Sequence, residues 1–359
     1  RFITRPSYEF NIASGKWIST SIYPVRNLKP EKTRSWEVGV NSKWLNNRLS
    51  FDLTYYRSST INQTFTADLS VSSGYSKAYI QSGNVRNEGM EIALGYSDKW
   101  GGFSWDSNLT FSWNQNKIIK LTEGSVNPMT GEPITKDNYE MGQLGNLDAR
   151  VKLYKGGSIG DVYATHRIKR DGNNNIYVSQ EGKIEIESVE EFKLGSILPK
   201  SNMGWSNSFS YKGVNLGVTL TARFGGIALS GTQSTLDQYG VSQVTADYRD
   251  AGGIFTNYGY VDTEKYFDTV KGYAAYYTYS ATNVRLSELN LSYTLPQKWF
   301  RDKLRMTVGL VGKNLWMIYC KAPFDPEATA STQSNYYQSY DYFMQPTTRN
   351  IGFSVKLNF

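Results

Sequence analysis

The chain ends in Ile351-Gly-Phe-Ser-Val-Lys-Leu-Asn-Phe359, and this stretch decides the fold class. Its apolar residues all fall at odd positions and its polar or small residues at even positions, so an extended strand would present them on opposite faces. A wall with lipid on one side and water on the other requires this pattern, as in a transmembrane β-barrel. A soluble sandwich can produce the alternation once, so the prediction depends on its recurrence.

The same alternation recurs along the chain. The apolar members of four further stretches are Trp36, Val38, Val40 and Trp44; Phe103, Trp105, Leu109, Phe111 and Trp113; Val214, Leu216, Val218, Leu220, Ala222 and Phe224; and Leu304, Met306, Val308 and Leu310. The residues between them are mostly Asn, Thr, Ser, Gly and charged residues, which suit a water-filled lumen. One stretch changes phase between Leu286 and Leu289, which predicts a β-bulge at Ser287-Glu288.

Composition agrees with a barrel wall. No run of about 18 apolar residues is present, so the chain offers no membrane-spanning helix. Aromatic residues make up 14 % of the chain, with 27 Tyr and 9 Trp, while the mean hydropathy is only −0.49. Polar lumen-facing residues lower the mean hydropathy of every strand, so a low mean hydropathy of the whole chain is compatible with a barrel. The net charge of +7 is spread without a dense basic run, so no nucleic-acid partner is expected.

The pattern predicts an all-β fold with nine antiparallel strands. They cover approximately residues 33–45, 48–60, 84–98, 102–119, 201–213, 214–226, 281–296, 301–316 and 346–359. Short connections alternate with long ones at 61–83, 120–200, 227–280 and 317–345, as in barrels with short periplasmic turns and long external loops. This places the C-terminus in the periplasm of a Gram-negative cell.

The odd strand number predicts an incomplete barrel, because single-chain bacterial barrels have even numbers of strands and no free edge. Residues 1–32 are interpreted as an external loop or the end of a preceding strand, and 33–359 as the C-terminal portion of a larger barrel. No secretory signal opens the chain, which indicates a processed or partial polypeptide.

Several segments resemble the SusC/RagA-like TonB-dependent transporters of the Gram-negative outer membrane. The segments, in family order, are Leu28–Val40 (LKPEKTRSWEVGV), Leu45–Tyr56, Gly83–Ile92 (GNVRNEGMEI), Val284–Pro296 (VRLSELNLSYTLP), Lys313–Trp316 (KNLW) and Phe324–Glu327 (FDPE). Each segment alone is weak, but together they cover most of the chain from residue 28 onward.

The resemblance implies a 22-stranded barrel with an N-terminal plug domain, of which this chain would supply about nine C-terminal strands. It also implies import of glycan oligosaccharides, powered by the TonB–ExbB–ExbD complex and covered by a SusD-like surface lipoprotein. An oligopeptide importer of the same family, a passive porin or adhesive surface barrel, and a soluble lectin are the alternatives. The implied partners are the remaining wall and plug, the lipoprotein, TonB–ExbB–ExbD, the solute and the lipid bilayer.

Two groups of residues are candidates for contacts within such a transporter. The loop tyrosines are Tyr258, Tyr260, Tyr276, Tyr277, Tyr336 and Tyr337. They could touch the solute or the lid, because Tyr offers a large contact area at low entropic cost, or they could simply pack the loops over the barrel mouth. Arg223, Arg285 and Arg305 are expected to face the lumen or the plug. Lumen charges of mixed sign argue against an ion filter of one sign.

No catalytic residue, metal or cofactor is expected. The chain has one His (His166) and one Cys (Cys320), too few for a Cys/His catalytic or transition-metal site. Asp171-Gly-Asn-Asn-Asn175 resembles the start of a calcium loop, but Ile176 and Gly182 occupy the positions that need Gly and Glu. A turn is therefore predicted there. The neighbouring carboxylates Glu190 and Glu191 lie in a polar stretch and are interpreted as solvated.

Overall fold

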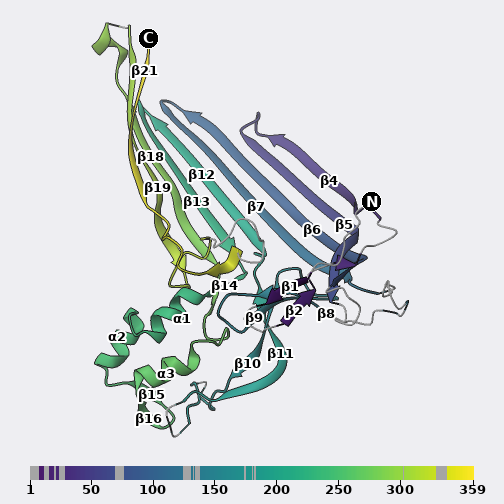
Figure 1. Cartoon of the computed structure of the whole chain (residues 1–359). Helices are drawn as coiled ribbons and strands as arrows, with labels where there is room; N and C mark the ends of the chain where they lie inside the picture. The colour runs from purple at the N-terminus through teal and green to yellow at the C-terminus, as the bar shows by residue number, and fades with distance from the viewer. Residues whose placement is uncertain are drawn as a thin grey trace.

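The computed structural model describes residues 8–11, 16–19, 22–23, 29–68, 77–123, 131, 133, 138–173, 175–179, 181, 183–301, 303–328 and 338–359. Within these residues the largest sheet follows nine strands in an antiparallel meander (Figure 1). In sheet order they are β4 (Lys32–Trp44), β5 (Leu49–Asp68), β6 (Lys77–Trp100), β7 (Phe103–Lys120), β12 (Ser201–Tyr211), β13 (Val214–Phe224), β18 (Asn283–Thr294), β19 (Arg305–Cys320) and β21 (Asn350–Asn358). The nine predicted strands are thus confirmed. A short strand, β3 (Ile22–Tyr23), also pairs with β6, in parallel.

The two faces of this main sheet differ in the predicted way. Leu310 lies opposite both Leu291 and Phe353, and Leu291 lies opposite Leu216, so these apolar side chains form one row across four strands. They stay accessible: Leu310 is 57 % exposed and Phe353 is 70 % exposed. A continuous exposed apolar row is unfavourable in water and suits a lipid-facing wall.

The predicted bulge in β18 is confirmed. Thr219 pairs with Glu288 and Leu220 pairs with Leu286, so Ser287 has no partner on β13. The extra residue returns the following leucines to the apolar face, because side chains alternate with a period of two. The Ser287 and Thr221 hydroxyls lie 2.5 Å apart and hydrogen-bond across the bulge.

The short turns lie at one end of the sheet, here named the turn end, together with the C-terminus (Figure 1). Between β12 and β13 the chain reverses over Lys212 (φ +46°) and Gly213 (φ +89°), a two-residue hairpin that requires positive φ at both positions. Positive φ at Asn46 and Asn47 closes the β4–β5 turn in a similar way. The opposite end is named the loop end.

The long connections are more structured than predicted. The prediction of loops at 120–200 and 227–280 is wrong: these segments fold into sheets and helices that lie at the loop end (Figure 1). A four-stranded sheet has the order β11 (Ile186–Ser196), β10 (Asp161–Ile168), β9 (Ala149–Tyr154) and β8 (Asn138–Gln143). Three helices follow: α1 (Gly231–Gln238), α2 (Gln243–Asp250) and α3 (Thr263–Val270).

Smaller strand pairs complete the loop end. They are β14 (Ile227–Ser230) with β17 (Thr278–Ser280) and β20 (Tyr340–Asp341), the hairpin β15 (Ile254–Thr256) with β16 (Gly259–Val261), and the N-terminal hairpin β1 (Tyr8–Asn11) with β2 (Lys16–Ser19). Residues 138–196, 227–280 and 338–343 are named the loop layer below. The predicted loop at 61–83 is wrong in extent, because β5 and β6 continue pairing to Asp68 and Lys77. Alternating Thr residues keep this polar stretch extended.

The main buried core lies in the loop layer. Leu144, Val151, Leu229, Phe267 and Tyr277 are almost completely buried within a single cluster. The helices beside it are only eight residues long, and each begins at a side chain that accepts a backbone N–H: Ser230, Ser242 and Asp262. None of the described helices is long and apolar enough to cross a membrane.

Candidate functional site

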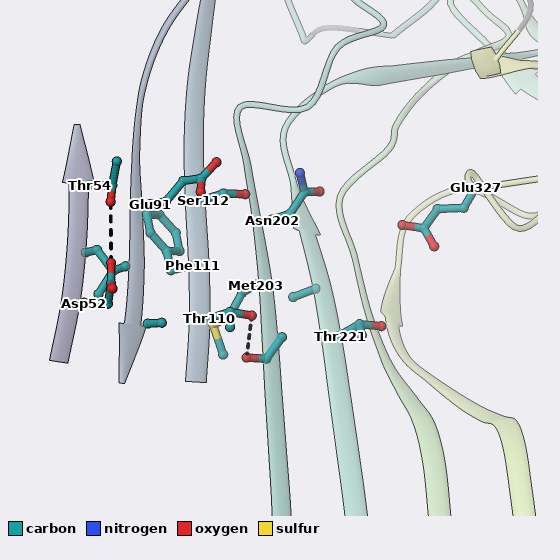
Figure 2. A pocket seen from close by; sticks show the side chains of 14 residues that line it. Asp52, Thr54, Glu91, Thr110, Phe111, Ser112, Asn202, Met203, Thr221 and Glu327 are labelled. Atoms are coloured by element: carbon teal, nitrogen blue, oxygen red, sulfur yellow. Dashed lines mark hydrogen bonds between the residues drawn. The ribbon is translucent and has the colours of Figure 1, made fainter. Parts of the chain in front are cut away.

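The polar face of the main sheet lines a cavity of about 620 Å³. Figure 2 shows Asp52 and Thr54 on one side of this cavity and Glu327 on the opposite side. Glu91, Ser112 and Asn202 are among the other lining residues, and no Lys or Arg is. The Asn41 amide donates to Asp52 at 2.8 Å, whereas no described ion pair involves Glu91. This inner wall therefore offers hydroxyl, amide and carboxylate groups to a hydrophilic solute.

Arg285 lies at the loop end of β18 and makes the densest polar contacts of the inner face. Its guanidinium donates to both carboxylate oxygens of Asp325, at 2.7 and 3.0 Å, and pairs with Glu327 at 3.0 Å. It also donates to the Asn314 side chain at 3.3 Å. The Arg285 and Asp325 side chains are 11 % and 7 % exposed, so this is a nearly buried bidentate pair.

These contacts join three of the segments that the sequence singled out. Arg285 belongs to VRLSELNLSYTLP, Asn314 to KNLW, and Asp325 with Glu327 to FDPE. Burial acts to raise the pKa of the Asp325 carboxyl, but the hydrogen bonds from Arg285 and the Glu327 N–H together hold that pKa below its usual range. The arrangement fixes residues 325–327 against the wall and presents Glu327 to the cavity.

The three predicted arginines do not form one cluster. Arg223 lies near Arg285 at the loop end, since Thr221 pairs with Arg285 and Arg223 pairs with Asn283. The Arg223 guanidinium donates to the Ile197 carbonyl at 2.9 Å. Arg305 begins β19 at the turn end and is exposed. Contact of any of them with a plug stays a prediction.

The predicted tyrosines divide into exposed and buried pairs. Tyr258 and Tyr260 are 50 % and 64 % exposed at the β15–β16 hairpin. Tyr276 and Tyr277 lie instead in the loop-layer core, where their rings pack edge to face with centroids 4.9 Å apart. Burial raises the pKa of Tyr276 to about 12 and raises that of Tyr277 further. Tyr277 is buried and Tyr276 is partly buried against the core, an arrangement that fits the packing role considered above, and contact with a solute or a lid stays a prediction. Tyr336 and Tyr337 lie outside the described residues.

Phe255 joins the two exposed tyrosines and was missed by the sequence reasoning. Its side chain is 73 % exposed and packs edge to face on Tyr260, with ring centroids 5.5 Å apart. Phe255, Tyr258 and Tyr260 are named the hairpin aromatics below. The alternation of Ile254, Phe255 and Thr256 could have revealed the strand that exposes Phe255, because successive strand residues point to opposite sides.

A second cavity, of about 500 Å³, lies at the loop end between β7, β10, β11 and the connections that follow β11 and β13. Asp161 and three lysines, Lys117, Lys193 and Lys200, are among its lining residues. The Asp161 side chain is 1 % exposed and accepts from Lys193 at 2.6 Å and from the Ser158 N–H at 3.0 Å. No sequence signal predicts this cavity, because its residues come from distant segments.

No group of His, Cys, Asp and Glu residues in the described part of the chain is suited to hold a metal. The predicted turn at 171–175 is confirmed: the Asp171 N–H donates to the Asn175 carbonyl at 2.9 Å. The Asp171 carboxylate accepts from the N–H groups of Asn173 and Asn175. His166 pairs with Asp148 at 2.9 Å, and Glu191 with Lys152 at 2.6 Å, so these groups stabilise the loop layer.

Comparison with known proteins agrees with the observed architecture. Residues 3–315 match the family described as TonB dependent receptor-like, beta-barrel. The chain is 26 % identical to the TonB-dependent receptor P3 of Formosa agariphila, covering 93 % of this chain and 34 % of the relative. It is 22 % identical to the TonB-dependent receptor SusC of Bacteroides thetaiotaomicron, covering 87 % of this chain and 31 % of the relative. The chain thus spans about a third of the length of these relatives.

A solved structure shares the fold. The RagAB peptide importer in its open-open state superposes with a TM-score of 0.72 at 17 % identity, covering 99 % of this chain and 38 % of the matched chain. At this identity the likeness concerns the fold alone. The match over residues 3–315 shows that the chain belongs to the TonB-dependent receptor-like β-barrel family, within which it is similar in sequence to SusC and in fold to the RagAB importer.

Proposed function

We propose that the chain forms the C-terminal part of the barrel wall of an outer-membrane importer of oligosaccharides. The two-faced main sheet carries this proposal: an exposed apolar face suits lipid, and a polar face lines a hydrophilic cavity. In this proposal the C-terminus lies in the periplasm, residues 1–32 form an external loop or the end of a preceding strand, and residues 33–359 form the C-terminal portion of the barrel. The receptors of this family are transporters and not enzymes, in keeping with the expected lack of a catalytic site.

The proposal requires further partners. The remaining wall and the plug would close the barrel, the TonB–ExbB–ExbD complex would supply energy, and a SusD-like surface lipoprotein would cover the loop layer. The strands β4 and β21 are the edges of the main sheet, and nearly all residues of both are exposed. Free edges of this length need partner strands, which the remaining wall would provide.

The hairpin aromatics support a sugar as the solute. Aromatic faces provide large and rigid contact areas, and three such side chains are exposed within one hairpin at the loop end. Hydroxyl and amide groups on the inner face offer donors and acceptors to sugar hydroxyls. An oligopeptide importer is the alternative, since the matched RagAB structure is named a peptide importer.

Uptake in cells tests the function. A strain that lacks the gene, and a strain that lacks TonB, should lose growth on the oligosaccharides that the wild type takes up. Growth on peptides alone would favour the oligopeptide importer, and growth that does not depend on TonB would favour a passive porin.

Variants of the hairpin aromatics sharpen this test. The double change Tyr258→Ala/Tyr260→Ala should weaken uptake about tenfold, if each ring contributes about 0.5–1.5 kcal/mol of stacking. The matched control is Tyr239→Ala, which removes a tyrosine that is 72 % exposed beyond α1. Equal uptake by the double variant and the control would show that the hairpin does not contact the solute.

A further inference from the structure

The cavity of about 500 Å³ at the loop end combines excess positive charge with an unused acceptor. Lys117, Lys193 and Lys200 line it, and Asp161 is the only carboxylate among its lining residues. Lys193 is paired with Asp161, whereas no described ion pair involves Lys117 or Lys200. Two ammonium groups are therefore available to an anion.

Asp161 supplies an independent indication of a ligand. Its side chain is 1 % exposed, and its second carboxylate oxygen, Oδ1, is buried without any hydrogen-bond partner. A buried acceptor of this kind is unfavourable unless a donor reaches it. A donor in the cavity reaches this oxygen only if the Asp161 side chain turns toward it, so a ligand that brings a hydroxyl or N–H group in addition to its negative charge suits the site.

The backbone leaves room for such a molecule. Five of the lining residues are glycines, and the Cβ position of Gly156 faces open space, with no heavy atom within 4 Å. Gly225 and Gly226 have φ of +76° and +82°, a conformation that other residues rarely adopt, so glycine suits the turn at this edge of the cavity. The Gln115 amide adds a further donor and acceptor, whereas the Asn116 amide is already bonded to Asn87, Ser158 and Ile159.

We propose that this cavity binds the acidic group of an oligosaccharide, a uronate carboxylate or a sulfate ester flanked by ring hydroxyls. The anion lies between Lys117 and Lys200, and a neighbouring hydroxyl donates to Asp161. This inference rests on the proposed function and narrows its substrate class to acidic glycans. The excess positive charge is confined to the loop-end cavity, because the larger cavity of about 620 Å³ has three carboxylates and no basic residue in its lining.

Binding measurements on the purified transporter, with its co-purifying partners, test the proposal. The probes are hexagalacturonate, neutral maltohexaose and hexaglutamate, each titrated by calorimetry at low and high salt. We expect hexagalacturonate to bind about tenfold more tightly than maltohexaose, equivalent to about 1.4 kcal/mol from two exposed charge contacts. This preference should shrink at high salt.

Charge variants connect the preference to the cavity. Lys117→Gln/Lys200→Gln should reduce the preference to less than about threefold and leave the thermal unfolding temperature unchanged, because exposed charges contribute little to folding. The matched control is Lys99→Gln/Lys298→Gln, which removes two exposed lysines at the turn end. Equal affinity for the acidic and neutral sugars, or a preference that the double variant retains, would overturn the proposal.

Two further outcomes separate this inference from the proposed function. TonB-dependent uptake of maltohexaose without any preference for the acidic sugar would reject the acidic site and leave the importer intact. Binding of hexaglutamate in place of either sugar would reject the saccharide as occupant. If cells import no oligosaccharide at all, both proposals fail.

Discussion

The guanidinium of Arg285 contacts two carboxylates and an amide at the loop end, and its pair with Asp325 is nearly buried. Removing charges from water is costly, and the cost is offset only when geometry is good and the remaining hydrogen-bonding groups are satisfied. The bidentate contact with Asp325 meets the geometric condition, whereas the Arg285 Nε is buried without a hydrogen-bond partner. The residue therefore attaches the 325–327 segment to the wall.

Replacing Arg285 by Ala should destabilise the protein by about 3–5 kcal/mol, because the buried Asp325 carboxylate would lose its partner. Thermal unfolding of the detergent-solubilised protein measures the loss, and hydrogen exchange of residues 321–328 should rise. Arg285→Met/Asp325→Leu is the matched control and should recover most of the stability, since it removes both charges. A single variant as stable as the wild type would show that the pair does not fix this segment.

The loop tyrosines give a second comparison between single residues. Tyr277→Ala should cost about 3–5 kcal/mol because it leaves a cavity in the loop-layer core. Tyr260→Ala removes an exposed ring and should change the unfolding free energy by less than about 0.5 kcal/mol. Unfolding of both variants is followed by near-ultraviolet circular dichroism. Similar losses for the two would contradict the distinction between packing and contact residues.

At the scale of elements, the bulge in β18 keeps one strand in phase with the rest of the wall. Inserting one Ala between Asn290 and Leu291 would move Leu291 and Tyr293 to the polar face, because a slip of one residue inverts every side chain that follows. We expect the insertion variant to fail to assemble in outer membranes, as judged by heat-modifiable mobility in gels. Deletion of Ser287 is the matched control: it removes only the extra residue, leaves Leu289 two positions after Leu286 and should assemble normally. Assembly of the insertion variant at the wild-type level would contradict the need for phase in this strand.

The loop layer should unfold at alkaline pH before the main sheet does. Burial raises the pKa of Tyr276 to about 12, above the ordinary value of 10, and raises the pKa of Tyr266, Tyr277 and Tyr279 as well. A Tyr whose pKa is raised in the folded state stabilises the fold while it is neutral. This stabilisation is fully present below pH 10 and is lost as the pH rises through the pKa of the folded state. For Tyr276 the loss approaches about 2–3 kcal/mol.

Absorbance of ionised tyrosine at alkaline pH, combined with circular dichroism, measures this transition. We expect these tyrosines to ionise only as the loop layer unfolds. The variant Tyr276→Phe is the control, and its stability should fall less steeply with pH. Ionisation of every tyrosine near pH 10 without unfolding would contradict the buried environment.

The elements of the wall were predictable from sequence because a period of two is a local property. Each strand reveals its own two faces, and the bulge reveals itself as a change of phase at Ser287. The loop layer was not predictable in the same way. Its helices have eight residues each, too few to show a clear helical period, and they depend on caps and tertiary packing.

The candidate site was predicted only in part. Tyr258, Tyr260, Tyr276 and Tyr277 occur in one Tyr-rich segment, and nothing local distinguishes the exposed pair from the buried one. The burial of Tyr276 and Tyr277 depends on α3 and on strands distant in sequence that pack over them. The lysines of the loop-end cavity are separated by many residues in sequence, so only the fold brings them together.

At the scale of the whole molecule, the account requires that one face of the main sheet contact lipid and the other contact water. β13 lies inside the sheet between β12 and β18, so its side chains report on both faces without edge effects. Cys320 is the single cysteine of these 359 residues, so single cysteines can be placed along this strand once Cys320 and any cysteine elsewhere in the transporter are replaced by Ser.

The most direct test is the accessibility of spin labels on cysteines placed at successive positions 216–221 of the transporter in outer-membrane vesicles. Labels at Leu216, Val218 and Leu220 should collide with lipid-soluble oxygen, and labels at Gly217, Thr219 and Thr221 with a water-soluble nickel chelate. This alternation would identify β13 as part of a transmembrane wall. Uniform access of the nickel chelate to all six positions would contradict it, because the apolar face would then lie in water.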